Sequence, residues 1–310
     1  MNIVFISEED TAPWKKALRR RLPEADVFFW GEGELDKAAM DYALVWKPEP
    51  GLVASFPNLK GIFNLGAGVD ALLQDTTLPR NVPLVRLVDP RLSQGMVEYV
   101  VYWVVHFHRD MQIYARHKRV REWRQYRNAD TAKRRVGILG LGELGTNCAH
   151  ALLMLGFETV SGWSRTHKEL PGVTSFAGKD ALKPFLQQCE ILVNLLPLTD
   201  ATHRILDQAA LDQLPEGAFV INAGRGATLD ETALIEALNS GHLAGAALDV
   251  FATEPLPQDH PFWTMDTVFI TPHIASLTSA SSAADVIAKA LRALEDGETP
   301  DNLVDWDQGY

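Results

Sequence analysis

Residues suited to handling charge and protons follow three short apolar runs in the second half of the chain, AFVIN, GAAL and TVFITP. These residues are Arg225, Asp249, Glu254 and His273. If the runs are parallel strands, their carboxyl ends face one crevice, so the four side chains can meet although they are far apart in sequence. An arginine pairs well with a carboxylate, and an imidazole exchanges protons near neutral pH. The group therefore predicts acid–base chemistry on an anionic substrate.

A glycine-rich motif, GLGELG, lies between an apolar run at 136–139 and a helical stretch. In this setting the first glycine allows a tight turn, the second lets the backbone approach a pyrophosphate, and the third lets the helix pack on the strand. Another apolar run follows at 159–164, as expected of a βαβ unit. The motif predicts a dinucleotide site. Its cofactor-binding residues are expected to be Gly140, Gly142, Glu143, Leu144 and Gly145.

The end of the run at 159–164 indicates which dinucleotide is bound. Sites for NAD usually place a carboxylate there to hold the ribose 2′-hydroxyl. This chain has Ser164, Arg165 and Thr166 instead, which can hold a 2′-phosphate through charge-assisted hydrogen bonds. We therefore expect NADPH to be preferred over NADH. The alternative is that Arg165 and Lys168 are solvated loop charges.

Beside a nicotinamide, the strand-end residues suggest the transfer of a hydride together with a proton. Arg225 would pair with a substrate carboxylate and polarise the adjacent carbonyl, and His273 would protonate the nascent alkoxide. Glu254, if hydrogen-bonded to His273, would favour the imidazolium, and Asp249 would orient the carboxamide of the cofactor. Each residue alone also has a structural explanation, since a strand-end histidine is often only a hydrogen-bonding partner.

The first hundred residues contain a second candidate site. The turn GAGVD follows an apolar run that ends near Leu65. Consecutive backbone N–H groups in such a turn, those of Ala67, Gly68 and Val69, can form a concave site for a small carboxylate. The alternative is a tight strand-to-helix turn without a ligand. Trp46, at the end of another run, would either shield the reacting centre from water or belong to the core.

Short apolar, β-branched runs alternate with helical or loop stretches over the first hundred residues, and the pattern restarts at Arg135. This alternation predicts two consecutive doubly wound α/β domains with parallel sheets. Long helices are expected at about 94–109 and 280–295. The length of 310 residues also corresponds to about two ordinary domains.

The composition excludes several classes of protein. With 29 basic and 40 acidic residues, the net charge of -11 disfavours nucleic acid as a partner. Two cysteines are too few for a zinc site or a disulfide framework, and both are expected to be buried. The start has no basic region of a secretory signal, and no apolar run is long enough for a membrane span. We expect no metal, no membrane contact and a cytoplasmic location.

Nine lysines and arginines against two acids lie between Arg116 and Arg135, in a chain that is otherwise acidic. One interpretation is a surface for an anionic ligand or partner. A second is a solvated helix face on which Trp123 and Tyr126 pack against a neighbouring element. A homodimer contact is the third.

The motifs GLGELG, NLLPLT, INAGRG, GAALDVFATEP and TPHIA, with LGAGVD upstream, resemble those of the D-isomer-specific 2-hydroxyacid dehydrogenases. The likeness spans nearly the whole chain. LVWKP, WSRT and PGVTSFAG look like the bacterial branch that reduces glyoxylate and hydroxypyruvate. The resemblance implies a flavodoxin-like substrate domain of residues 1–104 and 278–310, and a Rossmann domain for NADP of residues 105–277.

The resemblance also implies NADPH-dependent reduction of glyoxylate and hydroxypyruvate to glycolate and D-glycerate by a homodimer. Alternatives are another D-2-hydroxyacid specificity, or a nucleotide-sensing module like the corepressors among the relatives with this fold. The residues assigned by the resemblance are, for catalysis, Arg225, Glu254 and His273; for the cofactor, Leu196, Pro197, Ala223 and Asp249; and for the substrate, Ala67, Gly68 and Val69 with Arg225 and His273. Trp46 is a further substrate-site candidate because of its position at the end of an apolar run.

Overall fold

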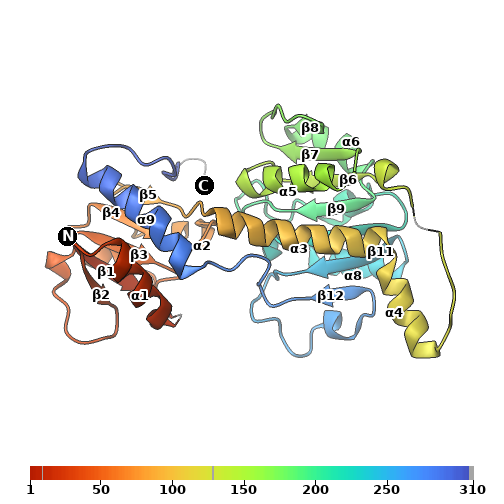
Figure 1. Ribbon diagram of the computed structural model, residues 1–310. Coiled ribbons are helices and arrows are strands. Elements are labelled where there is room, and N and C mark those ends of the chain that lie inside the picture. The colour runs from red at the N-terminus through yellow and green to blue at the C-terminus, as the bar shows by residue number, and fades with distance from the viewer. Residues whose placement is uncertain (9, 128, 307–310) are drawn as a thin grey trace. The chain divides into compact units, whose positions relative to one another are not determined.

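The chain forms two compact units in the computed structural model (Figure 1). The first contains Met1–Leu92 and Leu277–Tyr310, and the second contains Ser93–Ser276. Each has a parallel β-sheet with helices, so the expectation of two doubly wound α/β domains is confirmed. The residues described are 1–8, 10–127 and 129–306.

A five-stranded parallel sheet forms the centre of the first unit, in the order β2-β1-β3-β4-β5. This is the flavodoxin-like order. Its strands are β1 (Asn2–Ile6), β2 (Asp26–Phe29), β3 (Tyr42–Val45), β4 (Gly61–Asn64) and β5 (Leu84–Val85). The helices of this unit are α1 (Thr11–Arg21), α2 (Asp70–Leu73) and α9 (Ala280–Glu295), with the short 3-10 turns η1 (Lys37–Ala39) and η2 (Val53–Ser55).

The expectation of a helix at 280–295 is confirmed, and α9 packs beside α1 (Figure 1). Its buried positions, Ala283, Ile287 and Leu291 among them, recur at helical spacing on one face. Just before it, the Thr278 hydroxyl donates to the carbonyl of Leu65 at 2.9 Å. The last part of the chain is therefore an integral layer of the first unit.

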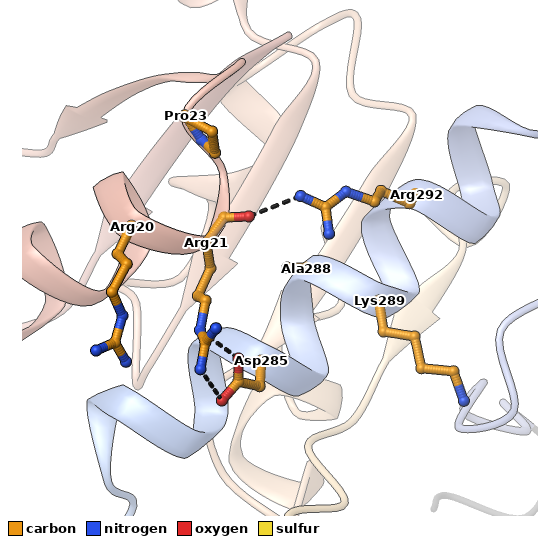
Figure 2. Close-up of a pocket in the computed structure, with 7 residues that line it drawn as sticks. All are labelled: Arg20, Arg21, Pro23, Asp285, Ala288, Lys289 and Arg292. Carbon is orange, nitrogen blue, oxygen red and sulfur yellow. Dashed lines mark hydrogen bonds and ion pairs between the residues drawn. The ribbon is translucent and has the colours of Figure 1, made fainter.

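A surface hollow of about 470 Å³ lies between α1 and α9 (Figure 2). Arg21 forms an ion pair with Asp285, and Arg292 donates to the carbonyl of Arg21 and to Glu24. These bonds link the two helices, and none of the candidate site residues lines the hollow.

A seven-stranded parallel sheet forms the centre of the second unit, in the order β12-β11-β10-β9-β6-β7-β8. The strands are β6 (Val136–Leu139), β7 (Val160–Ser164), β8 (Val173–Ala177), β9 (Ile191–Asn194), β10 (Ala218–Asn222), β11 (Leu243–Leu248) and β12 (Val268–Ile270). Helix α3 (Pro90–His108) enters this unit at Ser93. The other helices of the unit are α4 (Met111–Val120), α5 (Glu143–Met154), α6 (Leu182–Leu186), α7 (Gln208–Leu211) and α8 (Glu231–Asn239). Its 3-10 turns are η3 (Thr131–Lys133), η4 (Lys179–Ala181), η5 (Gly226–Thr228) and η6 (Pro261–Thr264).

The division between the units differs from the boundary at 104/105 and falls within the first turn of α3. From Met96 onward the buried face of α3, including Val100 and Phe107, packs in one apolar cluster with strand residues of the second sheet. The burial of that face assigns most of α3 to the second unit.

Of the helices in the described part of the chain, none is long and apolar enough to cross a membrane.

Strand β8 has no counterpart in the sequence prediction. It lies at the edge of the sheet, paired only with β7, and four of its five residues are partly buried. An edge strand of this kind lacks the continuous apolar run that marks the buried strands. The pattern VTSFA therefore gives a weak strand signal.

Candidate active site

The glycine-rich loop leads from β6 into α5 at the point where the strand order reverses, with β7 on one side and β9 on the other. Gly140 has φ of +99°, and a Cβ atom at Gly145 would collide with the Gly140 carbonyl oxygen. Both positions therefore require glycine. A Cβ atom at Gly142, the N-cap of α5, would meet nothing within 4 Å. Open space in front of a helix N-terminus is where a dinucleotide pyrophosphate fits this fold.

Polar groups and a cation, without a carboxylate, occupy the end of β7. The Ser164 hydroxyl donates to the carbonyl of Thr166 at 2.7 Å, and the Trp163 indole donates to the carbonyl of Gly178 at 2.9 Å. These bonds hold the turn against β8, and Arg165 and Thr166 are exposed on it. The donors present suit a phosphate ester better than a ribose diol.

Two buried asparagines at the ends of β9 and β10 organise the loops that follow these strands. Asn194 donates to Asn222 Oδ1 at 3.0 Å and to Thr228 Oγ1 at 2.6 Å, and its own oxygen accepts from the amide of Leu196 at 3.2 Å. Leu196 is buried, and Pro197 beside it is partly exposed. Sequence reasoning did not assign a role to this pair, although both residues end apolar runs, LVN and VIN, where a side-chain amide needs a partner.

Arg225 follows β10 in extended conformation and is half-buried. Its carbonyl accepts from the Thr228 hydroxyl at 2.6 Å, and its guanidinium donates to the carbonyl of Gly224 at 2.8 Å. A Cβ atom at Gly226 would collide with the backbone of Phe251. Backbone-to-backbone packing therefore joins the Arg225 loop to the loop after β11.

His273 and Glu254 are in direct contact. Nδ1 of His273 lies 2.8 Å from Oε2 of Glu254, and the other carboxylate oxygen accepts from the amide of Phe251 at 3.1 Å. The two side chains remain 39% and 30% exposed, so the pair is accessible to a ligand. Because Glu254 takes Nδ1, Nε2 is the ring atom that can exchange a proton with a ligand.

Asp249 is buried beneath this pair, with 1% of its surface exposed. Its Oδ1 accepts from the Thr271 hydroxyl at 2.6 Å and from the amide of Ile274 at 2.8 Å, and its Oδ2 accepts from the amide of Ala275 at 2.8 Å. The carboxylate therefore holds the loop that carries His273. A role in orienting a cofactor carboxamide stays a prediction.

The candidate substrate residues of the first unit follow β3 and β4. Asn64 is buried and donates to the carbonyls of Gly66 and Gly68 at 2.8 and 2.9 Å. A Cβ atom at Gly66 would collide with the ring of Trp46. Asn64, which sequence reasoning missed, therefore shapes the turn, and Trp46 packs on it. The remaining residues of the turn are the partly buried Ala67 and Gly68 and the buried Val69, which precedes α2.

The two cysteines and the basic segment at 116–135 were also candidates in the sequence, and the structure shows how their side chains are packed. Cys148 and Cys189 are buried, as expected, and burial raises the pKa of each thiol to about 12. Among the described residues, no group of three His, Cys, Asp or Glu side chains could hold a metal ion. In the basic segment, Tyr126 packs against Tyr114 and His117, whereas Trp123 is 97% exposed, so the expected packing holds for Tyr126 and not for Trp123.

A glycine-rich loop at the switch point of a parallel sheet, with an imidazole–carboxylate pair at the carboxyl ends of later strands, defines a dinucleotide-dependent α/β oxidoreductase. The chain belongs to the D-isomer specific 2-hydroxyacid dehydrogenase family, whose model for the NAD-binding domain matches residues 101–275. It is 45% identical, over the full length of both chains, to glyoxylate/hydroxypyruvate reductase A of Yersinia enterocolitica, and equally so to that of Serratia proteamaculans.

Solved structures of the same family also resemble this chain. A D-isomer specific 2-hydroxyacid dehydrogenase from Xanthobacter autotrophicus Py2, in complex with NADPH and MES, is 46% identical with a TM-score of 0.96, covering 100% of this chain and 99% of that one. An NADPH-dependent glyoxylate/hydroxypyruvate reductase from Sinorhizobium meliloti, in complex with NADP and sulfate, is 35% identical with a TM-score of 0.94 over all of both chains. The expectations of family and fold class are therefore confirmed.

Proposed function

We propose that this protein uses NADPH to reduce glyoxylate and hydroxypyruvate to glycolate and D-glycerate. The observation that carries the proposal is the 2.8 Å contact between His273 and Glu254, at the carboxyl edge of a dinucleotide-binding sheet. The names of the full-length relatives support the choice of substrates.

The proposed chemistry assigns one task to each residue. NADPH, when bound by the second unit, would supply the hydride for this reduction. Arg225 pairs with the substrate carboxylate and polarises the carbonyl. His273, protonated on Nε2, gives that proton to the carbonyl oxygen as it becomes a hydroxyl, and Glu254 stabilises the imidazolium through Nδ1. One hydride and one proton are added, so the product is the 2-hydroxy acid.

We assign the cofactor to the second unit, which holds the glycine-rich loop and the end of β7. The 2′-phosphate of NADPH would be held by Arg165 and Thr166, which supports NADPH over NADH. Ser164, whose hydroxyl donates to the Thr166 carbonyl, would shape this turn. The amides of Ala67 to Val69, shaped by Asn64, suit a small carboxylate.

The test is a turnover assay with glyoxylate, hydroxypyruvate, pyruvate and 3-phosphohydroxypyruvate, each with NADPH and with NADH, followed by loss of cofactor absorbance. We expect the first two substrates with NADPH to give the highest kcat/KM. A higher kcat/KM for pyruvate would replace the proposed substrates by another 2-oxo acid. NADPH binding without turnover of any substrate would favour a nucleotide-sensing role.

We also propose a homodimer that pairs through α3, α4 and the segment after α4. Large apolar side chains are exposed there, including Tyr102, Val120 and Trp123. A second copy would cover them. Light scattering should give twice the mass of the chain, and the substitution of Trp123 by Glu should shift the protein toward the monomer. A wild-type mass of one chain would overturn this proposal.

A further inference from the structure

We infer that Tyr99 and Thr271 are positioning residues for His273 and act through Asp249. The inference rests on the proposed function, in which His273 is the proton donor. Tyr99 lies outside the sequence motifs, and Thr271 is the first residue of TPHIA but had no role assigned to it. Neither side chain touches His273 in a hydrogen bond of the described structure. Their role follows from a chain of short hydrogen bonds that ends on the backbone of the His273 loop.

This series of hydrogen bonds begins at Tyr99 on helix α3 and ends at the buried carboxylate of Asp249. The hydroxyl of Tyr99 lies 2.8 Å from Thr271 Oγ1, and Thr271 Oγ1 lies 2.6 Å from Asp249 Oδ1. A carboxylate only accepts, so the single proton of Thr271 is used on Asp249. Tyr99 must therefore donate to Thr271. Burial raises the pKa of Tyr99 far above its usual value, which keeps the phenol protonated as this donor requires.

Asp249 in turn determines the shape of the loop around His273. The carboxylate accepts from the amides of Ile274 and Ala275 at 2.8 Å, and the backbone carbonyl of Asp249 accepts from the amide of His273 at 2.8 Å. His273 has φ of +55°, a left-handed conformation that is costly for a residue other than glycine. Bonds from Asp249 to three successive amides are what hold His273 in that conformation.

Loss of the Tyr99 hydroxyl would free the Thr271 rotor and weaken one of the two hydrogen bonds that restrain Oδ1 of Asp249, leaving the bond from the Ile274 amide. The loop would keep its course because the three amide bonds remain, but the direction of the imidazole would be less well defined. A small misplacement of a proton donor lowers the rate of the chemical step more than it weakens substrate binding. The role of Tyr99 and Thr271 is therefore to set the geometry of proton transfer.

The experiment compares Tyr99→Phe and Thr271→Val with matched controls. Tyr42→Phe removes a tyrosine hydroxyl that hydrogen-bonds to Glu295 in the first unit, and Thr271→Ser keeps the hydroxyl of the hydrogen-bond chain. We expect Tyr99→Phe and Thr271→Val to lower kcat roughly tenfold with little change in KM. Both controls should stay near the wild-type kcat. In a His273→Ala background, Tyr99→Phe should have no further effect on kcat.

Three outcomes would overturn the inference. These are a wild-type kcat for Tyr99→Phe, an equal loss for Tyr42→Phe, and a full additional loss in the His273→Ala background. Failure of the proposed function is distinguishable, because wild-type protein would then reduce none of the 2-oxo acids. In that case the NMR signals of the His273 imidazole in Tyr99→Phe decide the matter, since the inference requires them to shift and unchanged signals contradict it.

Discussion

The imidazole of His273 contacts the carboxylate of Glu254 through Nδ1, at 2.8 Å, and the backbone amide of Phe251 holds the second oxygen of that carboxylate at 3.1 Å. The carboxylate is thus oriented from one side by its own loop and is directed at the ring from the other. This arrangement sets the tautomer of the neutral histidine, with Nδ1 protonated, and stabilises the ring when it carries two protons. It is the geometry expected of a general acid whose working atom is Nε2.

Replacing His273 with Ala should lower kcat roughly 100-fold to 10,000-fold, because general acid catalysis by a positioned side chain contributes about that much. NADPH affinity should change little, and fluorescence titration of the cofactor measures it. His203→Ala, which removes an exposed histidine of the same unit, is the control. Full activity of His273→Ala would remove this residue from the mechanism.

Glu254→Gln should lower kcat less than His273→Ala does, since the amide keeps a hydrogen bond to the ring but loses the charge that stabilises the imidazolium. Single-turnover kinetics with saturating NADPH measure the chemical step in both variants. A kcat of Glu254→Gln equal to that of wild type would contradict the electrostatic role.

Arg165→Ala should weaken NADPH binding by about 1.5 to 3 kcal/mol, the range for hydrogen bonds to a charged group, and should spare NADH. Calorimetric titration with both cofactors is the measurement. Lys183→Ala removes another exposed cation of the same unit and should leave both affinities unchanged. An equal loss for both cofactors would show that Arg165 does not recognise the 2′-phosphate.

Two glycines of the cofactor loop should respond to alanine in different ways. Gly142→Ala places a methyl group in open space, so the thermal midpoint should change little while the KM for NADPH rises several-fold. Gly145→Ala drives a methyl group into the Gly140 carbonyl, and overpacking typically lowers the free energy of unfolding by about 1–3 kcal/mol, so here the thermal midpoint should fall as well. Equal thermal midpoints for the two variants would contradict the close packing at Gly145.

Burial, with smaller contributions from Arg134 and Arg109, lowers the pKa of His108 below its usual 6.5. The unfolded chain therefore binds a proton at a pH where the folded chain does not. The stability associated with this neutral histidine is complete above pH 6.5 and is lost as the pH falls from there through the folded pKa. Urea unfolding of wild type and His108→Gln at pH 8 and pH 5.5 should show the larger loss in wild type. An equal loss would remove His108 as the cause.

Much of the fold was predictable because buried parallel strands are short apolar runs, and β6, β9 and β10 show this most clearly. The pairing of His273 with Glu254 followed from the rule that parallel strands end at one edge of a sheet. The hydrogen bonds of Asn64, Asn194 and Tyr99 did not follow from any pattern. Each of these depends on which carbonyl or hydroxyl the folded chain brings within reach, and an isolated asparagine or tyrosine in a sequence carries no information about that partner.

The return of α9 to the first sheet has a consequence for the order of folding during synthesis. The first unit is incomplete until residues from 277 onward leave the ribosome, since Val304 and the buried face of α9 belong to its core. The second unit, by contrast, is a continuous stretch that is finished earlier. Domains fold as units when their residues become available, so the unit whose first strands are translated first is completed last. Until then the core that contains residues of β1 and β3 lacks Val304, and α1 lacks the helix that packs beside it.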